Sequence, residues 1–425
     1  MSNYSSKSAT VEFTAFGPDG GLLPLPKNPA TFTMPAQTQL AKLSSEIFGT
    51  GASTAQSGWI QIATDNADLG SFFQFGSTRQ LDGSVAFTES SKRFRFTRVF
   101  EGSAAFRGQN AVTFLSIANP TSRPVALTLN LMGPQPGQTL AAAQKRTLPA
   151  KGFLFGSISS IFGQALSVSG GYVDVHVTDG DGAVGFELIQ FPDRETDIGL
   201  NGVPDSSATD SYSAQLAVTS QYFTNLKLIN TSDGTRALTV RAVAENGSNL
   251  VPAVNLSLAA GQSLEQEIAQ VLGLPDGTSA IGSLHVTADG PGVIGDVIFG
   301  DPIAMYFAAG LTLQTKSFTE AVFSQVANGD YYFTGLAFYN PNQVSTDITI
   351  EVYSENGVKT GQLAAPIQLG PGMRVSRLLI EWMPATTGQM RGYVMVRSTQ
   401  PLIAQQLFGD TGMNFLSAVP PAVIK

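Results

Sequence analysis

Hydrophobic and polar residues alternate along short stretches of this chain, which is the pattern of half-buried β-strands. In "TGLAFYN", Thr334, Leu336, Phe338 and Asn340 fall on one face of such a strand. Two earlier stretches repeat this face, with Thr224, Leu226, Leu228 and Asn230, and with Thr113, Leu115, Ile117 and Asn119. Because the middle pair is always large and apolar, we expect this face to point into a core. The asparagine ends the strand, where its side chain can form a turn.

The phrase returns because the chain is built from repeats. Asn119, Asn230 and Asn340 lie about 110 residues apart, and Asn3 precedes Asn119 by nearly one more period. Turn signals, a helix-like segment and closing strands follow in the same order in every copy. The sequence therefore predicts an all-β fold of four tandem Ig-like β-sandwich modules, each with one short helix. The predicted modules are 1–91, 92–210, 211–317 and 318–425.

Local signals add detail to each module. "DG" at 19–20 and "NG" at 246–247 and 356–357 predict hairpin turns. A short helix is expected near 40–48 and at equivalent places such as 264–272, where it would plug one end of the core. If the modules stack end to end they make a rod, with about 35–40 Å for each module.

The first module is shorter than the others. Modules two to four each begin with two strand-like stretches that end in the anchor asparagine, whereas module one has only Asn3. We therefore expect an open edge or an incomplete core, which proteins normally cover. Three explanations stay open: a fragment of a longer array, a modified terminal repeat, or a strand donated by a neighbouring chain.

Composition narrows the class of protein. Of the 425 residues 43% are hydrophobic and only 13% are charged, which favours an extracellular or cell-surface protein. The net charge of −8 argues against nucleic-acid binding, which needs clustered Lys and Arg. No apolar run is long enough for a membrane helix, so membrane insertion is not expected. The absence of cysteine excludes disulfides and thiol nucleophiles. "MSNYSSKSATVEF" has no signal-peptide core, so we expect either an intracellular protein or a trimmed form.

Motifs with chemical associations have structural readings here. The stretches 180–185 and 290–295 match G-x-G-x-x-G, but both lie between strands of the repeat, so we expect hairpin turns instead of nucleotide sites. His176 and His285 sit at different offsets in one repeated strand and form no pair. No nucleophile signature is present, so an enzyme is not predicted.

Calcium is a minor alternative to the expectation of no cofactor. Asp65, Asn66 and Asp68 in one loop, and Asp179 and Asp181 in the equivalent loop, offer oxygen ligands at alternate positions. The distant glutamate of an EF-hand is missing from both loops.

Two further stretches bear on contacts between modules. Arg93, Arg95 and Arg98 alternate with phenylalanines, which predicts a strand with a solvated basic face at a module junction. The alternative is a docking patch for an acidic partner or a polysaccharide. Residues 192–212 are longer and more acidic than their equivalents, and we expect them to be a flexible joint.

Trp59, Tyr172 and Tyr393 occupy one repeated position, where module three has Ser283. Core packing is one interpretation of these aromatic residues. The other is a platform on which sugar rings stack, which makes them the candidate ligand-binding residues. No catalytic, cofactor-binding or metal-binding residue is predicted.

The chain resembles the tandem Ig-like β-sandwich repeats of bacterial surface and secreted proteins. The likeness rests on the T-x-L-x-[apolar]-x-N-[PT] strand, the D/N-G hairpin and the L-x-[AGP] segment before the helix. It implies a non-enzymatic spacer, stalk or adhesin, whose partners are other protein modules or copies of itself. A carbohydrate-binding array is the first alternative, with polysaccharide as partner. The second alternative is a filament subunit assembled by strand donation at the open edge of module one.

Overall fold

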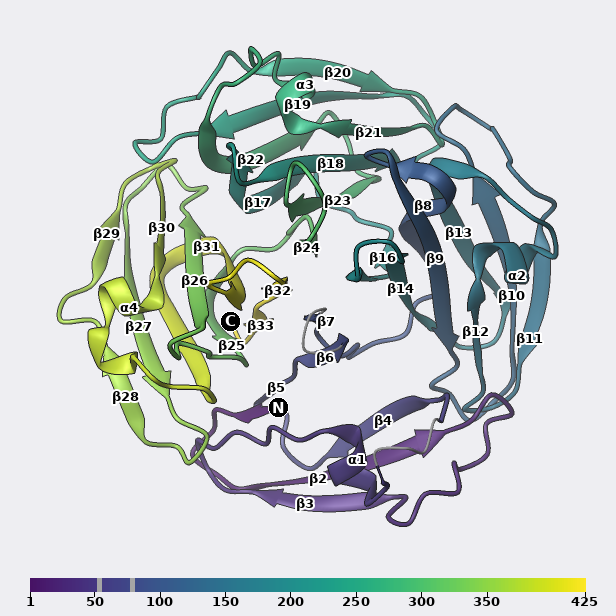
Figure 1. The fold of residues 1–425 in the computed structure, drawn as a ribbon, viewed down its shortest axis with the longest axis horizontal. Coiled ribbons are helices and arrows are strands. Elements are labelled where there is room, and N and C mark those ends of the chain that lie inside the picture. The colour runs from purple at the N-terminus through teal and green to yellow at the C-terminus, as the bar shows by residue number, and fades with distance from the viewer. Residues whose placement is uncertain (52–55, 77–80) are drawn as a thin grey trace.

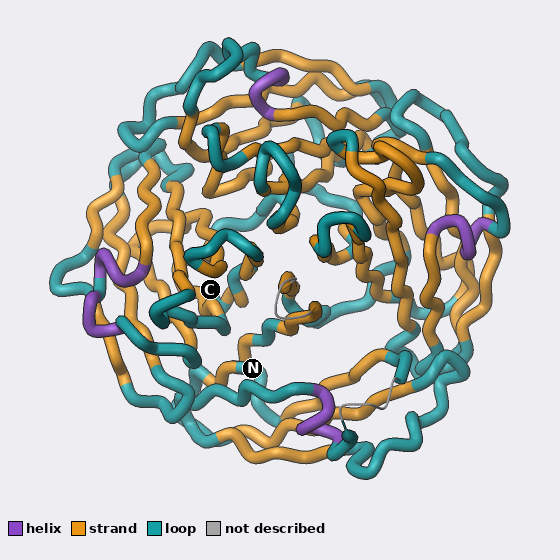
Figure 2. Tube along the Cα trace, in the orientation of Figure 1, coloured by secondary structure: helices purple, strands orange, loops and turns teal. Residues whose placement is uncertain are grey.

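Four β-sandwich modules close into a ring in the computed structural model, which describes residues 1–51, 56–76 and 81–425. The chain runs once around the ring, and both termini lie toward its middle (Figure 1). Strands dominate every module, and the helices are single short turns (Figure 2). The all-β prediction is confirmed, but the end-to-end rod is wrong, because the last module packs against the first.

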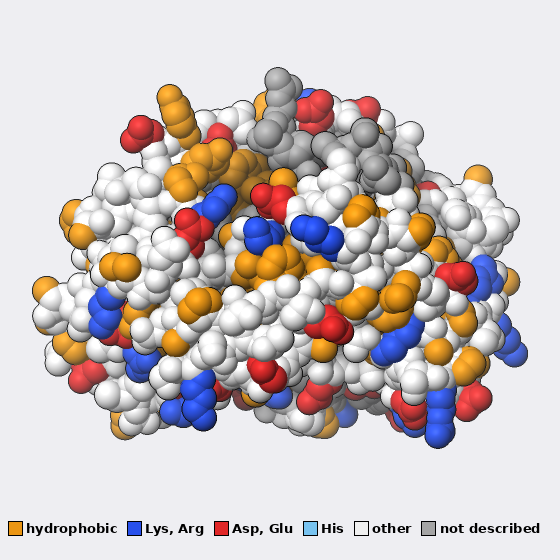
Figure 3. All heavy atoms as spheres, turned by 90° about the horizontal axis from the view of Figure 1, so that it is seen from below, with side chains coloured by type: hydrophobic (Ala, Val, Ile, Leu, Met, Phe, Trp, Pro, Cys, Tyr) orange, Lys and Arg blue, Asp and Glu red, His pale blue; other side chains and the backbone are white. Residues whose placement is uncertain are grey.

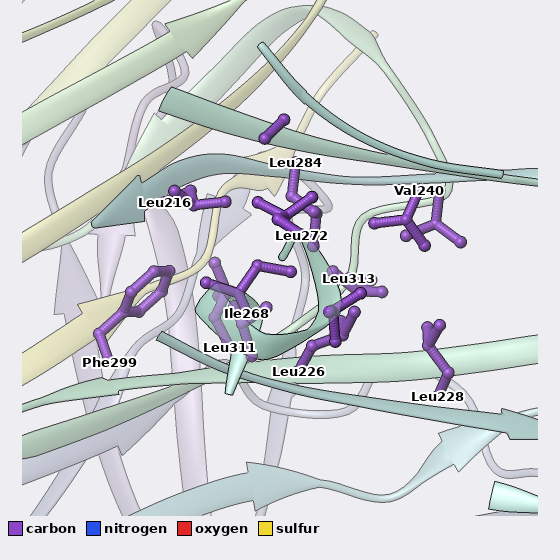
Figure 4. Close-up of a cluster of buried hydrophobic side chains, with 14 of the residues drawn as sticks. Leu216, Leu226, Leu228, Val240, Ile268, Leu272, Leu284, Phe299, Leu311 and Leu313 are labelled. Carbon is purple, nitrogen blue, oxygen red and sulfur yellow. The ribbon is translucent and has the colours of Figure 1, made fainter. Parts of the chain in front are cut away.

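Module 3 shows the complete plan as two packed antiparallel sheets. The first sheet has the order β17-β22-β19-β20 and the second β21-β18-β23-β24. Leu226, Leu284, Ile268 and Leu311 meet between the sheets and are buried (Figure 4). The elements are β17 (Asp210–Val218), β18 (Phe223–Asn230), β19 (Arg236–Val243), β20 (Val254–Leu258), β21 (Ser263–Glu267), α3 (Ile268–Val271), β22 (Ala280–Ala288), β23 (Val293–Gly300) and β24 (Ala308–Thr312).

Module 2 follows the same plan, with one strand that joins its two sheets. Strand β8 pairs with β13 in the first sheet and, at its far end, with β9 in the second. The elements are β8 (Arg93–Phe106), β9 (Gln109–Ala118), β10 (Val125–Met132), β11 (Gln144–Leu148), β12 (Phe153–Ser157), α2 (Ile158–Phe162), β13 (Val168–Asp179), β14 (Val184–Phe191), β15 (Thr196–Asn201) and β16 (Val203–Pro204).

Module 4 is also complete, and its long strand β31 runs through both sheets. Its first half pairs with β25 and β27, and its second half with β26 and β32. The elements are β25 (Phe318–Phe323), β26 (Tyr332–Tyr339), β27 (Thr346–Tyr353), β28 (Lys359–Gln362), β29 (Ile367–Leu369), β30 (Arg374–Leu378), α4 (Leu379–Trp382), the 3-10 helix η1 (Pro384–Thr386), β31 (Tyr393–Asp410), β32 (Leu416–Val419) and β33 (Ala422–Val423).

Module 1 has the same order of elements without the two opening strands. Its sheets are β3-β2-β4, with the short pairs β1-β5 and β6-β7. The elements are β1 (Ser2–Asn3), β2 (Ala9–Phe16), β3 (Ala30–Met34), α1 (Ser44–Phe48), β4 (Trp59–Thr64), β5 (Leu69–Gly70), β6 (Phe73–Gly76) and β7 (Leu81–Ser84). Its core contains Ala9, Val11, Phe13 and Phe48.

The predicted helices are present but shorter than expected. α1 begins at Ser44 instead of Leu40, and α3 begins at Ile268. The residues before α3 form strand β21, because Leu264 pairs with Leu228 in the second sheet. Each helix directs apolar side chains into the core, such as Phe48 of α1 and Ile268 of α3, as the plug interpretation predicted.

The four anchor asparagines make the same turn, which confirms their predicted structural role. Each side-chain amide donates to a carbonyl four residues on and to two carbonyls at the end of a neighbouring strand, and each is fully buried. For Asn230 the acceptors are the carbonyls of Gly234, Leu258 and Ala259, at 2.7, 2.9 and 3.1 Å. Asn3 forms the same three bonds, so the first module begins in register with the others.

The two G-x-G-x-x-G stretches connect the two sheets of a module, so the expected hairpin is wrong. Residues 180–183 lie between β13 and β14, and 184–185 begin β14; likewise, 290–295 begin between β22 and β23 and end in β23. These strands are not hydrogen-bonded partners of each other. The stretches therefore form a strand–turn–strand arch, with Gly182 at φ 133°, and no helix follows that could hold a phosphate.

The closing strands β7, β15, β24 and β32 meet near the middle of the ring, each against two others. Residues 192–212, expected to be a flexible joint, supply β15 to this assembly and β16 as a partner of β8. That expectation is wrong, because Ile198 and Leu200 of β15 are buried there. Asp82 of β7 is fully buried and accepts hydrogen bonds from the Gly199 amide at 2.9 Å and the Ser417 hydroxyl at 3.0 Å.

No helix in the described residues has the length and hydropathy to cross a membrane.

Candidate interaction site: the module junctions and the unfinished first module

One contact recurs at the module junctions. A turn residue with left-handed backbone, Gln37, Lys151, Gly261 or Gly372, faces the hairpin of the preceding module. At three of the four junctions the hairpin glycine comes so close that a side chain has little room, whereas Gly137 at the 2–3 junction faces open space. A Cβ on Gly20 would lie 1.9 Å from the Ala150 carbonyl oxygen, and one on Gly357 would lie 2.9 Å from the Gln37 carbonyl oxygen. The predicted hairpin turns therefore also fix how the modules join.

The three candidate ligand-binding aromatics lie at these junctions. The Trp59 indole donates to the Lys151 carbonyl at 2.7 Å, and Tyr172 to the Gly261 carbonyl at 2.9 Å. Tyr393 donates to the Gln37 carbonyl at 3.1 Å. Each therefore bonds the turn of the following module. Their proposed contact with a ligand stays a prediction.

The junction between modules 4 and 1 closes the ring. Gln39 accepts from the Gly392 amide and donates to the Gly392 carbonyl, both at 2.7 Å. Its own backbone amide donates to the Glu355 carbonyl at 2.9 Å. These bonds join residues from opposite ends of the chain.

The junction between modules 2 and 3 contains a buried charged cluster. Arg98 of β8 is fully buried and pairs with Asp296, while it donates to the Asn225 side chain at 2.6 Å. Lys227 is also buried and lies 3.2 Å from a Glu265 carboxylate oxygen. Burial lowers the pKa of Lys227 despite this carboxylate.

The predicted solvated basic face on β8 is therefore wrong. Arg95 and Arg98 are buried, at 2% and 0% exposure, and only Arg93 stays in contact with solvent. Their acidic partners lie within the same chain. The alternation of arginine and phenylalanine on this strand therefore marks a junction between modules instead of a solvent-exposed surface. Burying such charges requires paired partners, and the fold supplies them.

The junction between modules 3 and 4 combines hydrogen bonds with a buried apolar cluster that contains Ala214 of module 3 and Ile403 of module 4. Gln215 of β17 accepts from Arg374 at 2.6 Å, and the Ser213 hydroxyl donates to the Gln405 side chain at 3.1 Å. Burial lowers the pKa of Arg374 to about 10. In modules 2 and 3 the first opening strand thus reaches the second sheet of the next module.

The junction between modules 1 and 2 lacks this strand. β4 pairs only with β2, whereas its equivalents β13, β22 and β31 each have partners on both sides. β6 pairs only with β7, whereas β14 and β23 have partners on both sides. Within the described residues, module 1 thus leaves unpaired two strand edges that have partners in the complete modules.

Exposure shows that the core of module 1 is open at this place. Ile60 of β4 is 42% exposed, while Val173, Leu284 and Val394 at the same position of the other modules are fully buried. The expected incomplete core is therefore present.

Module 2 turns an aromatic surface toward the gap. Phe155 is 51% exposed and stacks on Phe114, with ring centroids 5.7 Å apart. Phe186 contacts Phe73 and Phe75 of β6 at 5.3 and 5.4 Å. We call the space bounded by the β4 edge, β6 and these module 2 phenylalanines the notch. The side of the molecule that carries module 1 shows hydrophobic side chains in a hollow (Figure 3).

The two loops considered for calcium hold no acidic cluster. Asp65 accepts from the Thr10 amide at 2.8 Å, a bond that lowers its pKa. Asp179 and Asp181 are exposed. In the described part of the chain no group of three or more His, Cys, Asp or Glu side chains is placed to hold a metal. Calcium binding stays a prediction.

Several buried polar residues escaped the sequence analysis. Glu187, Asp296 and Asp82 are fully buried, and burial raises the pKa of the Glu187 and Asp82 carboxyls. The available signal was a charge inside an otherwise apolar strand, as in "FELIQF" or "GDVIFG".

Comparisons with known proteins add no family. No family model matches the sequence, and no curated protein matches it. Among solved structures, the crystal structure of red sea bream transglutaminase has a TM-score of 0.10 and 11% identity, over 52% of this chain and 32% of that one. A likeness of this size carries no argument about fold or function.

Proposed function

We propose that this protein is a non-enzymatic structural or adhesive protein of the cell surface or exterior. The observation that carries the proposal is the closed ring, in which one hairpin-to-turn contact recurs between modules and returns from Gly357 to Gln37. Such closure favours a rigid scaffold over a flexible string of modules.

The way the chain uses its charged residues supports the same conclusion. Arg98, Lys227 and Asp296 are buried between modules, and their bonds join one module to the next. A catalytic group must reach its substrate, and these groups do not reach solvent. The low share of charged residues, 13%, fits an exterior location.

The proposal is tested by offering the purified chain two panels. Immobilised polysaccharides and cell-surface proteins should retain it, while esters, glycosides and peptides should be unchanged in its presence. Turnover of any panel substrate that co-purifies with the chain would overturn the proposal.

A second candidate function, strand acceptance, is favoured by the unpaired edge of β4. Strand addition to a free sheet edge is a common mode of protein recognition. The filament version requires a donor strand from a second copy, but every strand named above is already paired within its own chain. The donor is therefore better sought in another polypeptide.

A further inference from the structure

We propose that the notch binds an extended segment of another polypeptide, as an antiparallel partner of β4, and that this segment is apolar on both of its faces. The inference rests on the second candidate function and adds the chemistry of the partner.

The complete modules show how the equivalent edge is used. β8 lies antiparallel on β13, β17 on β22 and β25 on β31. β4 holds the position of β13, β22 and β31 in module 1, and its partner β2 leaves one edge free. The free edge thus presents backbone donors and acceptors to an incoming strand.

The face of the segment toward module 1 must be apolar. Ile60 is 42% exposed and Ile62 is half-buried, although the residues at the same two positions of the other modules point into a core. In module 2 the core position opposite Val173 is filled by Phe96, which is fully buried. A large apolar side chain opposite Ile60 would close the core in the same way.

The face of the segment toward module 2 must be apolar as well, because the 1–2 junction differs from the 2–3 junction in the side chains at three positions. At the 2–3 junction, Arg98 meets Asn225, Glu265 and Asp296. Pairing registers place aromatic residues at the same three positions of module 2. These are Phe114 for Asn225, Phe155 for Glu265 and Phe186 for Asp296.

The residue that takes the place of Arg98 therefore faces phenylalanines at the three positions where Arg98 meets Asn225, Glu265 and Asp296. An arginine buried there would lack its ionic partners, whereas a leucine or phenylalanine would bury apolar surface. The expected partner strand consequently reads as a continuous apolar run instead of an alternating one.

We assign the segment to a separate polypeptide, because no strand in the described residues is free to supply it. All strands from β1 to β33 in the described residues have partners in their own chain. A second copy would have to unfold a paired strand before donating it.

Two synthetic peptides test the proposal on the intact chain. One has the sequence of residues 93–102, and the other is the same peptide with Arg98→Leu. We expect the leucine peptide to bind at least about tenfold more tightly, because it does not bury an unpaired charge. Binding is read by fluorescence anisotropy of a labelled peptide. Amide exchange should slow at Ile60 and Ile62 when the peptide is bound.

Matched variants locate the binding site. Phe155→Asp should weaken binding of the leucine peptide at least about tenfold, because the new carboxylate places a charge against the apolar face of the peptide. Ile281→Asp, at a residue of similar exposure in module 3 (49% against 51%), should leave binding unchanged.

Three results would overturn the proposal. These are no binding of either peptide, tighter binding of the arginine peptide, or dimerisation of the free chain that Phe155→Asp abolishes, which would make a second copy the occupant. None of these results bears on turnover or on surface binding, so the proposed structural or adhesive role stands or falls separately.

Discussion

The hydroxyl of Tyr393, in the last module, donates a hydrogen bond to the carbonyl of Gln37, in the first module, across 3.1 Å. Trp59 and Tyr172 make the equivalent bond to the module that follows each of them. The last junction thus repeats the others, although its two sides lie at opposite ends of the chain. The modules are therefore arranged cyclically, and module 1 follows module 4 in the same way as each other module follows the one before it.

Substitution of Gly357 should weaken this closing junction. A Cβ there would lie 2.9 Å from the Gln37 carbonyl oxygen, and φ is 79°, so Gly357→Ala adds both a clash and backbone strain. We expect a loss of about 2–3 kcal/mol in the free energy of unfolding, measured by chemical denaturation.

Gly137→Ala is the control for that substitution. Its φ is 67°, but a Cβ would meet nothing within 4 Å, so it reports strain alone, about 1 kcal/mol. Equal losses for the two variants would show that the contact with Gln37 contributes nothing.

The anchor asparagine should be among the most sensitive positions in the chain. Asn230→Ala removes the side-chain donor from the carbonyls of Gly234, Leu258 and Ala259, of which Ala259 keeps the Gln262 amide as a donor. We expect a loss of about 2–4 kcal/mol in the free energy of unfolding. Asn246→Ala, in an exposed turn, should change it by less than about 1 kcal/mol. A loss at Asn230 no larger than at Asn246 would contradict the structural role.

The buried charge cluster predicts a large difference between two arginines of one strand. Arg98→Met leaves Asp296 buried without its cation and should lower the free energy of unfolding by about 3–5 kcal/mol. Arg93→Met breaks an ion pair with Asp174 in which the arginine is 47% exposed, and should change it by less than about 1 kcal/mol. Similar effects of the two variants would show that the cluster is not buried in solution.

Asp82 predicts a pH dependence of stability. Burial raises the pKa of its carboxyl to about 7, from an ordinary value of 3.8. The folded state therefore holds the proton more tightly than the unfolded state, and its stabilising effect is lost as the pH rises from about 4 through 7.

Thermal unfolding should accordingly occur at a lower temperature at pH 8 than at pH 6, and Asp82→Asn should reduce this difference. Asn can still accept from the Gly199 amide, so the variant isolates the charge. An unchanged pH dependence in the variant would assign the effect to other groups.

Much of the fold could be predicted from the sequence because local patterns determine it. Alternation around Leu226 and Leu228 predicts the anchor strand, and the repeated Asn predicts its turn. The pair Asn246–Gly247 predicts the hairpin, because glycine readily adopts a left-handed backbone, and the structure shows that conformation at Gly247.

The arrangement of the modules could not be predicted in this way, because it depends on contacts between residues far apart. Alternation on β8 shows that Arg98 and Phe96 face opposite sides, but not that Asp296 lies opposite Arg98, 198 residues along the chain. Missing opening strands predicted an open edge in module 1. Only the pairing registers of the structure show that Phe114 and Phe155 take the positions that Asn225 and Glu265 have at the next junction.

Small-angle X-ray scattering of the intact chain over a concentration series tests the closed ring most directly. Four modules in a closed ring predict a compact particle, with a radius of gyration of about 22–25 Å that does not depend on concentration. Four modules in a row would reach about 140–160 Å in length. A radius of gyration near twice the compact value, with a pair-distance distribution extending to that length, would contradict the ring.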